Sequence, residues 1–331
     1  MNLQADVVVG LQAGDEAKGK VTHHLCKSGD YTHVLRYNGG CNAGHTIYHN
    51  GNKFVTHHIP AGVFFGIKSI IGAGCVLNID QFFKELGELQ KGGIDINGLV
   101  FVSENTHIIT DSHIEEESAE SKIGTTRRGN GPAYRDKYFR KGLRAADVPL
   151  LKPFLIDTYE EFHNSDEPVN ILCEGAQGFE LDIDWGDYPY VTSSHCTSAG
   201  ALLNGLPPKS LSKVWGVGKI YQTYVGSKSF EPSGEEFEKI REYGEEFGAT
   251  TGRPRQCNWL DLDKLKRAIT VNGVTDLVLN KVDVMRRLGM WKLITDGQVR
   301  EFTTETEMKD FIEEAVGRDL NVYFSESKER I

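Results

Sequence analysis

Several common sequence features are missing from this chain of 331 residues. Its six cysteines are scattered and form no Cys-x-x-Cys pair, which argues against a zinc site and favours reduced thiols. No apolar run reaches the length of a membrane-spanning helix. The first residues show no basic stretch followed by an apolar one, so we expect no signal peptide. The predicted location is the cytoplasm.

Positive charge is also scarce. The chain has 37 lysines and arginines against 47 aspartates and glutamates, and its formal net charge is −10. The basic residues cluster only locally, which argues against general affinity for nucleic acid or for a membrane surface. An anionic nucleotide held by a few arginines is compatible with this pattern. No Pro/Ser-rich linker, repeat or low-complexity tract divides the chain.

Short apolar runs recur along the sequence, and most are separated by enough residues for a helix. This spacing is typical of strands joined by helical crossovers. We therefore predict an α/β fold with a mostly parallel central sheet and flanking helices, formed by one catalytic domain over residues 1–331. The predicted strands are Val7–Gly10, Thr32–Tyr37, Ser69–Ala73, Val100–Val102, Val169–Cys173, Trp215–Ile220, Asp276–Leu279 and Asn321–Phe324.

Other segments have different signatures. Residues 47–56 are split by Asn50-Gly51, which predicts a β-hairpin with a type I′ turn. Apolar residues at helical spacing predict one helix from Asp80 to the glycines at 92–93 and another over 304–316.

The segment 10–20 joins the first predicted strand to a predicted helix. A glycine-bearing turn in this position directs backbone N–H groups and the helix dipole at a phosphate. Residues 14–20 fit the P-loop spacing G-x-x-x-x-G-K, but Val21 stands where a P-loop carries the Ser or Thr that holds Mg²⁺. The metal ligand must then come from elsewhere, and Asp15 and Glu16 are the candidates. The alternative is an ordinary glycine-containing connection with solvated charges.

A second glycine-rich loop, residues 38–46, follows another predicted strand. Its glycines allow close approach to a ligand, and strand ends are where open α/β sheets bind ligands. Asn42, His45 and Thr46 supply an amide, an imidazole and a hydroxyl. The alternative is a histidine with a purely structural role.

The predicted strand at 276–279 runs into Asn280, Lys281, Val282 and Asp283. This N-K-x-D pattern is typical of GTP-binding proteins, where the aspartate accepts hydrogen bonds from guanine N1–H and the 2-amino group. It predicts GTP as a ligand, and the alternative is a strand followed by a charged helix cap.

Three further segments are unusual: Gly-Thr-Thr-Arg-Arg-Gly-Asn-Gly-Pro-Ala-Tyr from 124, Glu-Gly-Ala-Gln-Gly…Tyr-Pro-Tyr-Val-Thr-Ser-Ser over 174–194, and Gly-Ala-Thr-Thr-Gly-Arg-Pro-Arg at 248–255. With the two glycine-rich loops they resemble adenylosuccinate synthetase. The family motifs are G-x-Q-W-G-D-E-G-K-G-K, G-G-x-N-A-G-H-T, G-T-T-x-R-G-I-G-P-A-Y, E-G-A-Q-G…Y-P-Y-V-T-S-S and G-A-T-T-G-R-x-R. Their order is kept, and the match covers about residues 6–285.

The resemblance implies a ligase that transfers the γ-phosphate of an NTP to O6 of a 6-oxopurine monophosphate. The amine of L-aspartate then displaces phosphate at C6. It implies that Asp15 takes the N1 proton and binds Mg²⁺, with the Gly44 carbonyl as a further metal ligand. It implies that His45 stabilises the transferring phosphoryl group.

The resemblance also implies three binding sites. The NTP site comprises Glu16, Ala17, Lys18, Gly19, Lys20, Thr46, Asn280, Lys281 and Asp283. The monophosphate site comprises Asn42, Thr126, Arg140, Gln177, Thr192 and Arg253, with Arg140 reaching over from the partner in a homodimer. The aspartate site comprises Thr250, Thr251, Arg253 and Arg255.

The chain departs from the family at several positions. Ala13 replaces Trp and Ala17 replaces Gly. Tyr224 and Lys228-Ser229 stand in a segment where the family has T-R-V-G-x-G-P-F, a loop that lies near the ribose in the family. The C-terminal residues 324–330 lack T-G-P-x-R, which helps hold the NTP base.

A diverged viral branch of the family uses dGMP in place of IMP and makes 2-amino-2′-deoxy-N6-succinoadenylate. Many of its members carry Ser at the Asp15 position, whereas this chain keeps Asp. The altered loop and tail favour dGMP as substrate. If the chain belongs to the viral branch, we expect it in the cytoplasm of the host. We expect GTP to be the phosphoryl donor, with ATP or dATP as alternatives. An ordinary adenylosuccinate synthetase that uses IMP and GTP is the main alternative.

Two other classes of function are open. A GTP-dependent binding or regulatory protein accounts for the phosphate loop and N-K-x-D, but does not need the segment 248–255 or the loop of Gln177. A P-loop kinase acting on a monophosphate is disfavoured by Val21.

Overall fold

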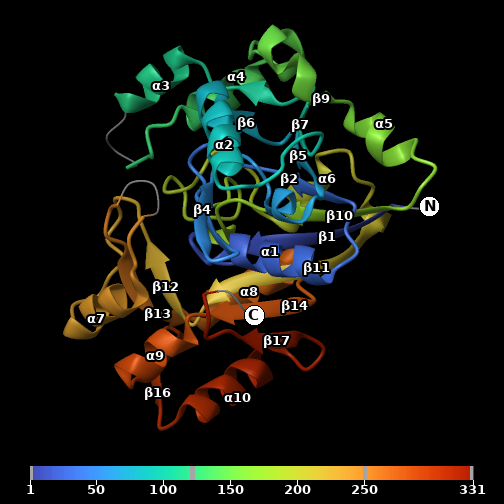
Figure 1. Cartoon of the computed structure of the whole chain (residues 1–331). Helices are drawn as coiled ribbons and strands as arrows, with labels where there is room; N and C mark the ends of the chain where they lie inside the picture. The colour runs from blue at the N-terminus through green and yellow to red at the C-terminus, as the bar shows by residue number, and fades with distance from the viewer. Residues whose placement is uncertain (1–2, 120–123, 249–251, 329–330) are drawn as a thin grey trace.

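The computed structural model describes residues 3–119, 124–248, 252–328 and 331, and a large parallel sheet forms its centre (Figure 1). The sheet has nine strands in the order β17-β14-β11-β1-β10-β2-β5-β7-β9, and every neighbouring pair is parallel. The prediction of a mostly parallel sheet is confirmed. The strands are β1 (Leu3–Gly10), β2 (His33–Arg36), β5 (Lys68–Ile71), β7 (Val100–Ser103), β9 (Leu155–Ile156), β10 (Val169–Glu174), β11 (Leu211–Lys219), β14 (Asp276–Asn280) and β17 (Asn321–Phe324).

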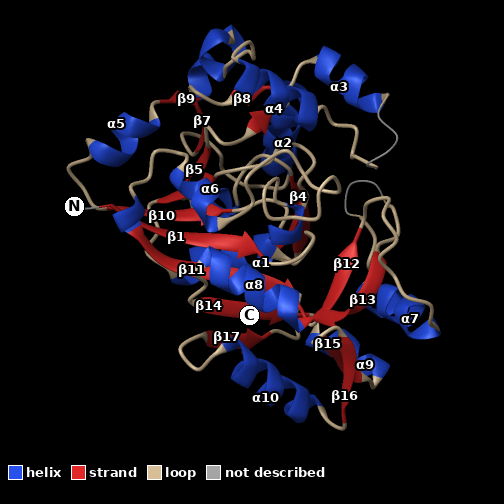
Figure 2. Cartoon of the chain, turned by 180° about the vertical axis from the view of Figure 1, so that it is seen from behind, coloured by secondary structure: helices blue, strands red, loops and turns tan. Residues whose placement is uncertain are grey.

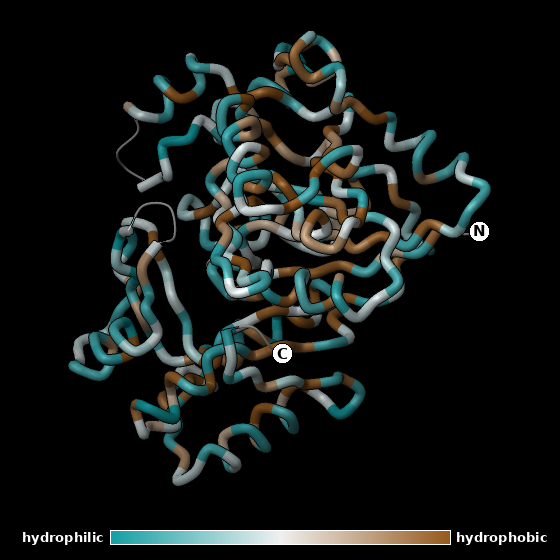
Figure 3. The backbone as a smooth tube through the Cα atoms, in the orientation of Figure 1, coloured by the Kyte–Doolittle hydropathy of each residue, from teal (hydrophilic) through white to brown (hydrophobic). Residues whose placement is uncertain are grey.

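Helices cover both faces of this sheet (Figure 2). Val8 of β1 belongs to the apolar cluster that includes Val21 of α1, whereas Val7 and Val9 belong to the cluster that includes α8. Because both faces are buried, the central strands are continuous apolar runs. Apolar colour accordingly gathers along the central strands in Figure 3. The α-helices are α1 (Lys18–Ser28), α2 (Ile79–Lys91), α3 (Asp111–Ser118), α4 (Asn130–Phe139), α5 (Thr158–His163), α6 (Ser198–Leu202), α7 (Glu235–Gly244), α8 (Leu262–Asn272), α9 (Val282–Leu288) and α10 (Glu305–Val316).

A second sheet was not foreseen from the sequence. Its strands are β12 (Tyr221–Tyr224), β13 (Gln256–Asp261), β15 (Trp291–Thr295) and β16 (Gln298–Phe302), in that order. Trp259, Leu260 and Leu293 from this sheet share one apolar cluster with β1 and α8. The small sheet is thus packed onto the same core as the large one.

The local elements agree with their sequence signals. Residues 45–56 form the hairpin β3 (His45–His49) and β4 (Asn52–Thr56), and Asn50 and Gly51 both have positive φ, at 48° and 77°. A type I′ turn requires this pair of left-handed residues. The helices predicted from Asp80 and over 304–316 are α2 and α10. The remaining short elements are β6 (Val76–Leu77), β8 (His107–Ile108), η1 (Ala61–Phe65), η2 (Ala145–Asp147), η3 (Pro149–Phe154), η4 (Phe179–Leu181) and η5 (Pro208–Ser210).

The fold positions the turns that matter for function. Five neighbouring strands, β14, β11, β1, β10 and β2, are parallel, so their carboxyl ends meet at one edge of the sheet. The turns after them carry the phosphate loop, the second glycine-rich loop, the Gln177 loop and the N-K-x-D segment. Within the described residues, no helix is long and apolar enough to cross a bilayer.

Gly178 allows two of these turns to approach closely. A Cβ atom on Gly178 would lie 2.2 Å from the carbonyl oxygen of Gln12 and 2.4 Å from Oε1 of Glu16. Neither distance is tolerable for carbon and oxygen. A side chain at this position would therefore push the loop after β10 away from the phosphate loop.

We expect Gly178→Ala to lower the free energy of unfolding by about 1–3 kcal/mol, the usual cost of forcing extra atoms into a packed site. Gly87→Ala is the matched control, because a Cβ on this glycine of α2 meets nothing within 4 Å. It should stabilise the protein by about 0.5–1 kcal/mol through helix propensity. Urea unfolding measures both, and equal stability of Gly178→Ala and the wild type would contradict the close contact.

Candidate active site

One cavity of about 490 Å³ lies where the five sequence motifs come together. Residues of every motif line it, although the motifs are spread from residue 10 to residue 255. The predicted site residues among its lining are Asp15, Ala17, Lys18, Gly19, Lys20, Asn42, Gly44, His45, Thr46, Thr126, Gln177, Thr192, Arg253, Arg255, Asn280, Lys281 and Asp283. Thr250 and Thr251 lie outside the described residues. Glu16 and Arg140 are described, but they do not line this cavity.

Glu16 is buried inside the phosphate loop instead. Its carboxylate accepts hydrogen bonds from the backbone N–H groups of Gln12 and Gly14, at 3.2 and 2.9 Å. It also accepts from Nζ of Lys18 at 2.6 Å. The side chain thereby fixes the shape of the loop that presents the remaining residues to the cavity.

Lys20 ties the phosphate loop to two distant segments. Its ammonium donates to Oδ1 of Asn280, to Oγ of Ser325 at 2.7 Å and to the carbonyl of Ser327 at 3.0 Å. Asn280 in turn donates from Nδ2 to the backbone carbonyl of Glu16 at 2.7 Å. Burial, and then the charge of Lys281, lower the pKa of Lys20 to about 8. The C-terminal tail thus closes over the lysine of the phosphate loop.

The end of the N-K-x-D segment also lines the cavity. Lys281 has a left-handed backbone, with φ of 70°, and donates from Nζ to the carbonyl of Gly244 at 2.7 Å. Asp283 stands in the first turn of α9, where its side chain is exposed and lines the cavity. A carboxylate in this position can accept hydrogen bonds from a base.

His45 is buried at the start of β3 against two charged side chains. Its Nδ1 lies 2.5 Å from Oε1 of Glu174, and Nη2 of Arg36 donates to the same oxygen at 2.7 Å. The other oxygen of Glu174 accepts from the backbone N–H of Ala61 at 2.8 Å. This carboxylate assigns the imidazole proton to Nδ1 and leaves Nε2 for the cavity.

The charges of this cluster are mutually dependent. Burial, reinforced by Arg36, lowers the pKa of His45 to about 4, so the imidazole is neutral at pH 7. Burial opposes ionisation of Glu174, but Arg36 and His45 bring the pKa of this carboxyl down to about 2. Sequence reasoning did not single out Glu174 or Arg36. The available signal was a charged residue at the end of each of two apolar strands.

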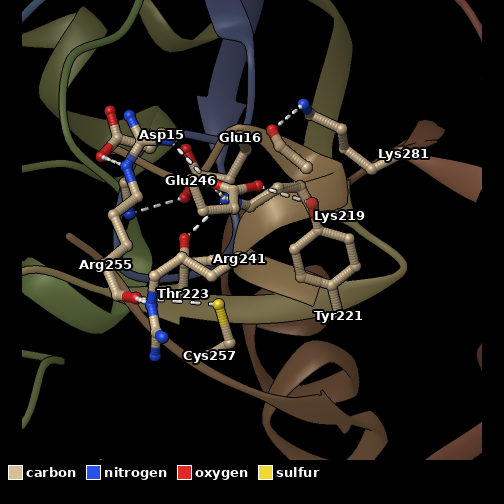
Figure 4. A network of polar contacts seen from close by, with 12 residues as sticks. Asp15, Glu16, Lys219, Tyr221, Thr223, Arg241, Glu246, Arg255, Cys257 and Lys281 are labelled. Atoms are coloured by element: carbon tan, nitrogen blue, oxygen red, sulfur yellow. Dashed lines mark hydrogen bonds and ion pairs between the residues drawn. The ribbon is translucent and has the colours of Figure 1, made fainter. Parts of the chain in front are cut away.

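Asp15 faces Arg255 across the cavity wall. Oδ2 of Asp15 lies 2.8 Å from Nε of Arg255, whose Nη1 donates to Glu246 at 2.5 Å (Figure 4). Asp15 has a left-handed backbone, with φ of 59°, and its side chain is 30% exposed. Asp15 and Gly44 line the same cavity, and a carboxylate and a backbone carbonyl are the hard oxygen donors that Mg²⁺ prefers. They fit the metal that the sequence predicts.

A second acidic cluster lies elsewhere. Ligand atoms of Asp182, Asp184 and His195 lie within 4.8 Å of one another. However, both oxygens of Asp182 already accept backbone N–H groups, from Asp184 and Trp185 on one side and from Cys196 on the other. Asp182 therefore stabilises the conformation of its own loop through these hydrogen bonds.

Amide groups on the predicted monophosphate side are incompletely satisfied. Nδ2 and Oδ1 of Asn130 and Oε1 of Gln177 are buried without a hydrogen-bond partner among the described residues. Nε2 of Gln177 donates to Oδ1 of Asn42 at 3.2 Å. Because buried polar groups are normally paired, these atoms indicate where a polar ligand binds.

Arg140 ends α4 on the molecular surface. It has a left-handed backbone, with φ of 65°, and its side chain is exposed. The two preceding residues are large, apolar and also exposed: Tyr138 by 64% and Phe139 by 69%. This surface is separate from the lining of the cavity.

Comparison with known proteins gives one consistent result. The model of the adenylosuccinate synthetase family matches residues 7–152 and 148–315. The adenylosuccinate synthetase of Chlorobium chlorochromatii is 39% identical over 360 residues, covering 91% of this chain and 82% of the relative. The enzyme of Cytophaga hutchinsonii is 40% identical, covering 86% and 78%.

Solved structures agree with this similarity. The fully ligated adenylosuccinate synthetase of Plasmodium falciparum matches with a TM-score of 0.81 and 29% identity, over 94% of this chain and 86% of that one. The succinoaminodeoxyadenylate synthetase of cyanophage S-2L, solved with dGMP and dATP, matches with a TM-score of 0.77 over 99% and 93%. At 22% identity the second likeness concerns the fold alone.

Proposed function

The chain belongs to the adenylosuccinate synthetase family of carbon–nitrogen bond-forming ligases, and we propose that it uses an NTP to join L-aspartate to C6 of a purine nucleoside monophosphate. The observation that carries this proposal is that residues of all five motifs line one cavity. A GTP-dependent binding protein needs a nucleotide loop but no such convergence. We further propose that residues 1–331 act as one catalytic domain.

The proposed reaction has two steps because the oxygen on C6 must first be converted into a good leaving group. Oxide is a poor leaving group, so C6 of a 6-oxopurine resists substitution. Transfer of the γ-phosphate to O6 makes that oxygen part of a phosphate, and the NDP leaves. The amine of aspartate then attacks C6, and the C6–O6 bond breaks to release phosphate.

Asp15 would accept the proton that leaves N1 of the purine during the first step. Its exposed carboxylate and the Gly44 carbonyl would hold Mg²⁺, which supplies charge stabilisation for the phosphates when it is bound. Lys18, Gly19 and Lys20 would hold the phosphates from the loop that Glu16 shapes.

His45 would face the transferring phosphoryl group with Nε2. A phosphoryl anion beside this atom favours the imidazolium form, because an opposite charge raises the pKa of a histidine. Glu174 already accepts from Nδ1 and would offset the new positive charge. The buried cluster would thus orient the imidazole so that it can stabilise the negative charge of the phosphoryl group.

We predict that Asp15→Asn, which keeps the shape of the side chain and removes the base, lowers kcat at least about 10²-fold. The measurement is release of phosphate in the presence of NTP, monophosphate, Mg²⁺ and aspartate, with the product identified by mass. A binding or regulatory protein would show no aspartate-dependent release in the wild type. Near-normal turnover in Asp15→Asn would refute the assignment.

For the monophosphate we propose dGMP. Tyr224 lines the cavity where the family has an arginine, and its hydroxyl lies over Gly226, where an added Cβ would come within 1.9 Å of it. The phenol is therefore packed into its own loop. Because no guanidinium stands at this position, the wall has fewer hydrogen-bond donors for a 2′-hydroxyl. This favours a nucleotide with deoxyribose. Ordinary use of IMP and GTP is the alternative that the names of the curated relatives fit.

We expect kcat/KM for dGMP to exceed the values for GMP and for IMP. Tyr224→Arg should narrow the preference for the deoxynucleotide, and Tyr224→Phe, which keeps the packed ring, should retain it. Assays with IMP, GMP, dGMP and dIMP, each with GTP, ATP and dATP, decide the question and also identify the donor that Asp283 would recognise. The highest kcat/KM for IMP would make the chain an ordinary adenylosuccinate synthetase.

We also propose a homodimer in which Arg140 completes the site of the partner subunit. This arginine is exposed beside Tyr138 and Phe139 and lies outside the lining of its own cavity. Large exposed apolar side chains next to a functional arginine are expected at an interface.

If the homodimer forms in this way, Arg140→Ala and Asp15→Asn should each be inactive alone and should regain partial activity when mixed. Each hybrid dimer would contain one site with both residues intact. The measurement is aspartate-dependent phosphate release after mixing, with hybrid formation checked by mass. Hybrids that form without activity would place Arg140 outside the partner's site.

A further inference from the structure

A buried ion-pair network lies behind Arg255, on the side away from Asp15 (Figure 4). Its centre is Glu246, whose side chain is fully buried on the turn after α7. Nothing in the sequence motifs assigned a role to this carboxylate. Its charge must nevertheless be compensated, because a buried unpaired carboxylate is costly.

Three side chains satisfy Glu246. Tyr221 donates its hydroxyl to Oε1 at 2.6 Å, and Nζ of Lys219 lies 3.2 and 3.3 Å from the two oxygens. Nη1 of Arg255 donates to Oε2 at 2.5 Å. Although burial opposes ionisation, Lys219 and Arg255 lower the pKa of Glu246 to about 2.

The two acidic partners of Arg255 have opposite surroundings. Glu246 is fully buried, whereas the side chain of Asp15 is 30% exposed and lines the cavity. Glu246 is also held from behind by Tyr221 and Lys219, and Lys219 is anchored further on Thr223 at 2.5 Å. One edge of the guanidinium is therefore fixed by Glu246. The other edge faces Asp15, whose side chain lines the cavity.

The backbone reinforces this arrangement. The N–H of Arg255 donates to the carbonyl of Glu246 at 3.0 Å, so the two residues are paired through main chain and side chain. Phe247 and Pro254, the next residues inward, form an isolated bridge. Glu246 and Arg255 thus stand together at the base of the loop that carries the fifth motif.

We infer that Glu246 is a positioning residue for the aspartate site: it fixes one edge of the guanidinium of Arg255, so that the edge now facing Asp15 is presented to the cavity and can bind a carboxylate of the substrate. This inference rests on the proposed function, in which Arg255 binds L-aspartate. A planar guanidinium recognises a carboxylate through two parallel hydrogen bonds, so its orientation matters as much as its charge. Without Glu246, Arg255 would keep Asp15 as its acidic partner and lose the anchor that orients it.

The test is Glu246→Gln, which keeps the size of the side chain and can still accept from Tyr221. We expect the KM for aspartate to rise roughly 10- to 100-fold, as for the loss of a hydrogen bond to a charged group, while kcat and the KM for the monophosphate change less than about threefold. Glu161→Gln is the matched control, because Glu161 is a partly buried carboxylate that, among the described residues, pairs with Lys68 and His33 and with no residue of the Arg255 network. It should leave the KM for aspartate within about twofold of the wild type.

A second variant separates positioning from charge balance. Glu246→Gln leaves Lys219 buried without its carboxylate and can destabilise the fold, whereas the double variant Lys219→Met/Glu246→Gln removes both charges. We expect the double variant to recover thermal stability and to keep the raised KM for aspartate. Recovery of both properties would overturn the inference, and so would a normal KM for aspartate in folded Glu246→Gln. Absence of aspartate-dependent product in the wild type would instead reject the proposed function.

Discussion

The site depends on one constraint, the parallel alignment of five neighbouring strands. Parallel strands end at the same edge, so the turns after β14, β11, β1, β10 and β2 must meet there. This is why Lys20 and Asn280, which are 260 positions apart, share a hydrogen bond. The same geometry places Arg36 and Glu174, at the ends of β2 and β10, within reach of His45. No local interaction within one motif could produce the cavity.

Buried carboxylates then fix the functional groups at this edge. Glu16, Glu174 and Glu246 have fully buried side chains, and each is paired with a cation: Lys18, Arg36 and Arg255. Such pairs add little net stability, because the cost of desolvation offsets their attraction, but losing one partner is expensive. Their effect here is on geometry. Each carboxylate restricts a loop, an imidazole or a guanidinium to one orientation toward the cavity.

Much of the large sheet could be predicted from the sequence, because each central strand is a short apolar run followed by glycine or polar residues. The hairpin over 45–56 was equally clear from Asn50-Gly51. The small sheet gave no comparable signal. β12 follows β11 after the single residue Ile220, and most residues of β16 are exposed, so neither a turn nor an apolar alternation marks these strands. Partners such as Glu246 could not be found because their contacts join segments far apart in sequence.

Several departures from the family lie on the walls of the cavity. Ala13, Tyr224, Ser327 and Lys328 all line the cavity. His45 is instead held by Glu174, at the end of β10 in the large sheet. A wall residue can change without moving the sheet, whereas a change behind His45 would leave a buried charge unpaired. Under the proposed function, substitutions at these wall positions would change the choice of nucleotide and leave the buried cluster behind His45 in place.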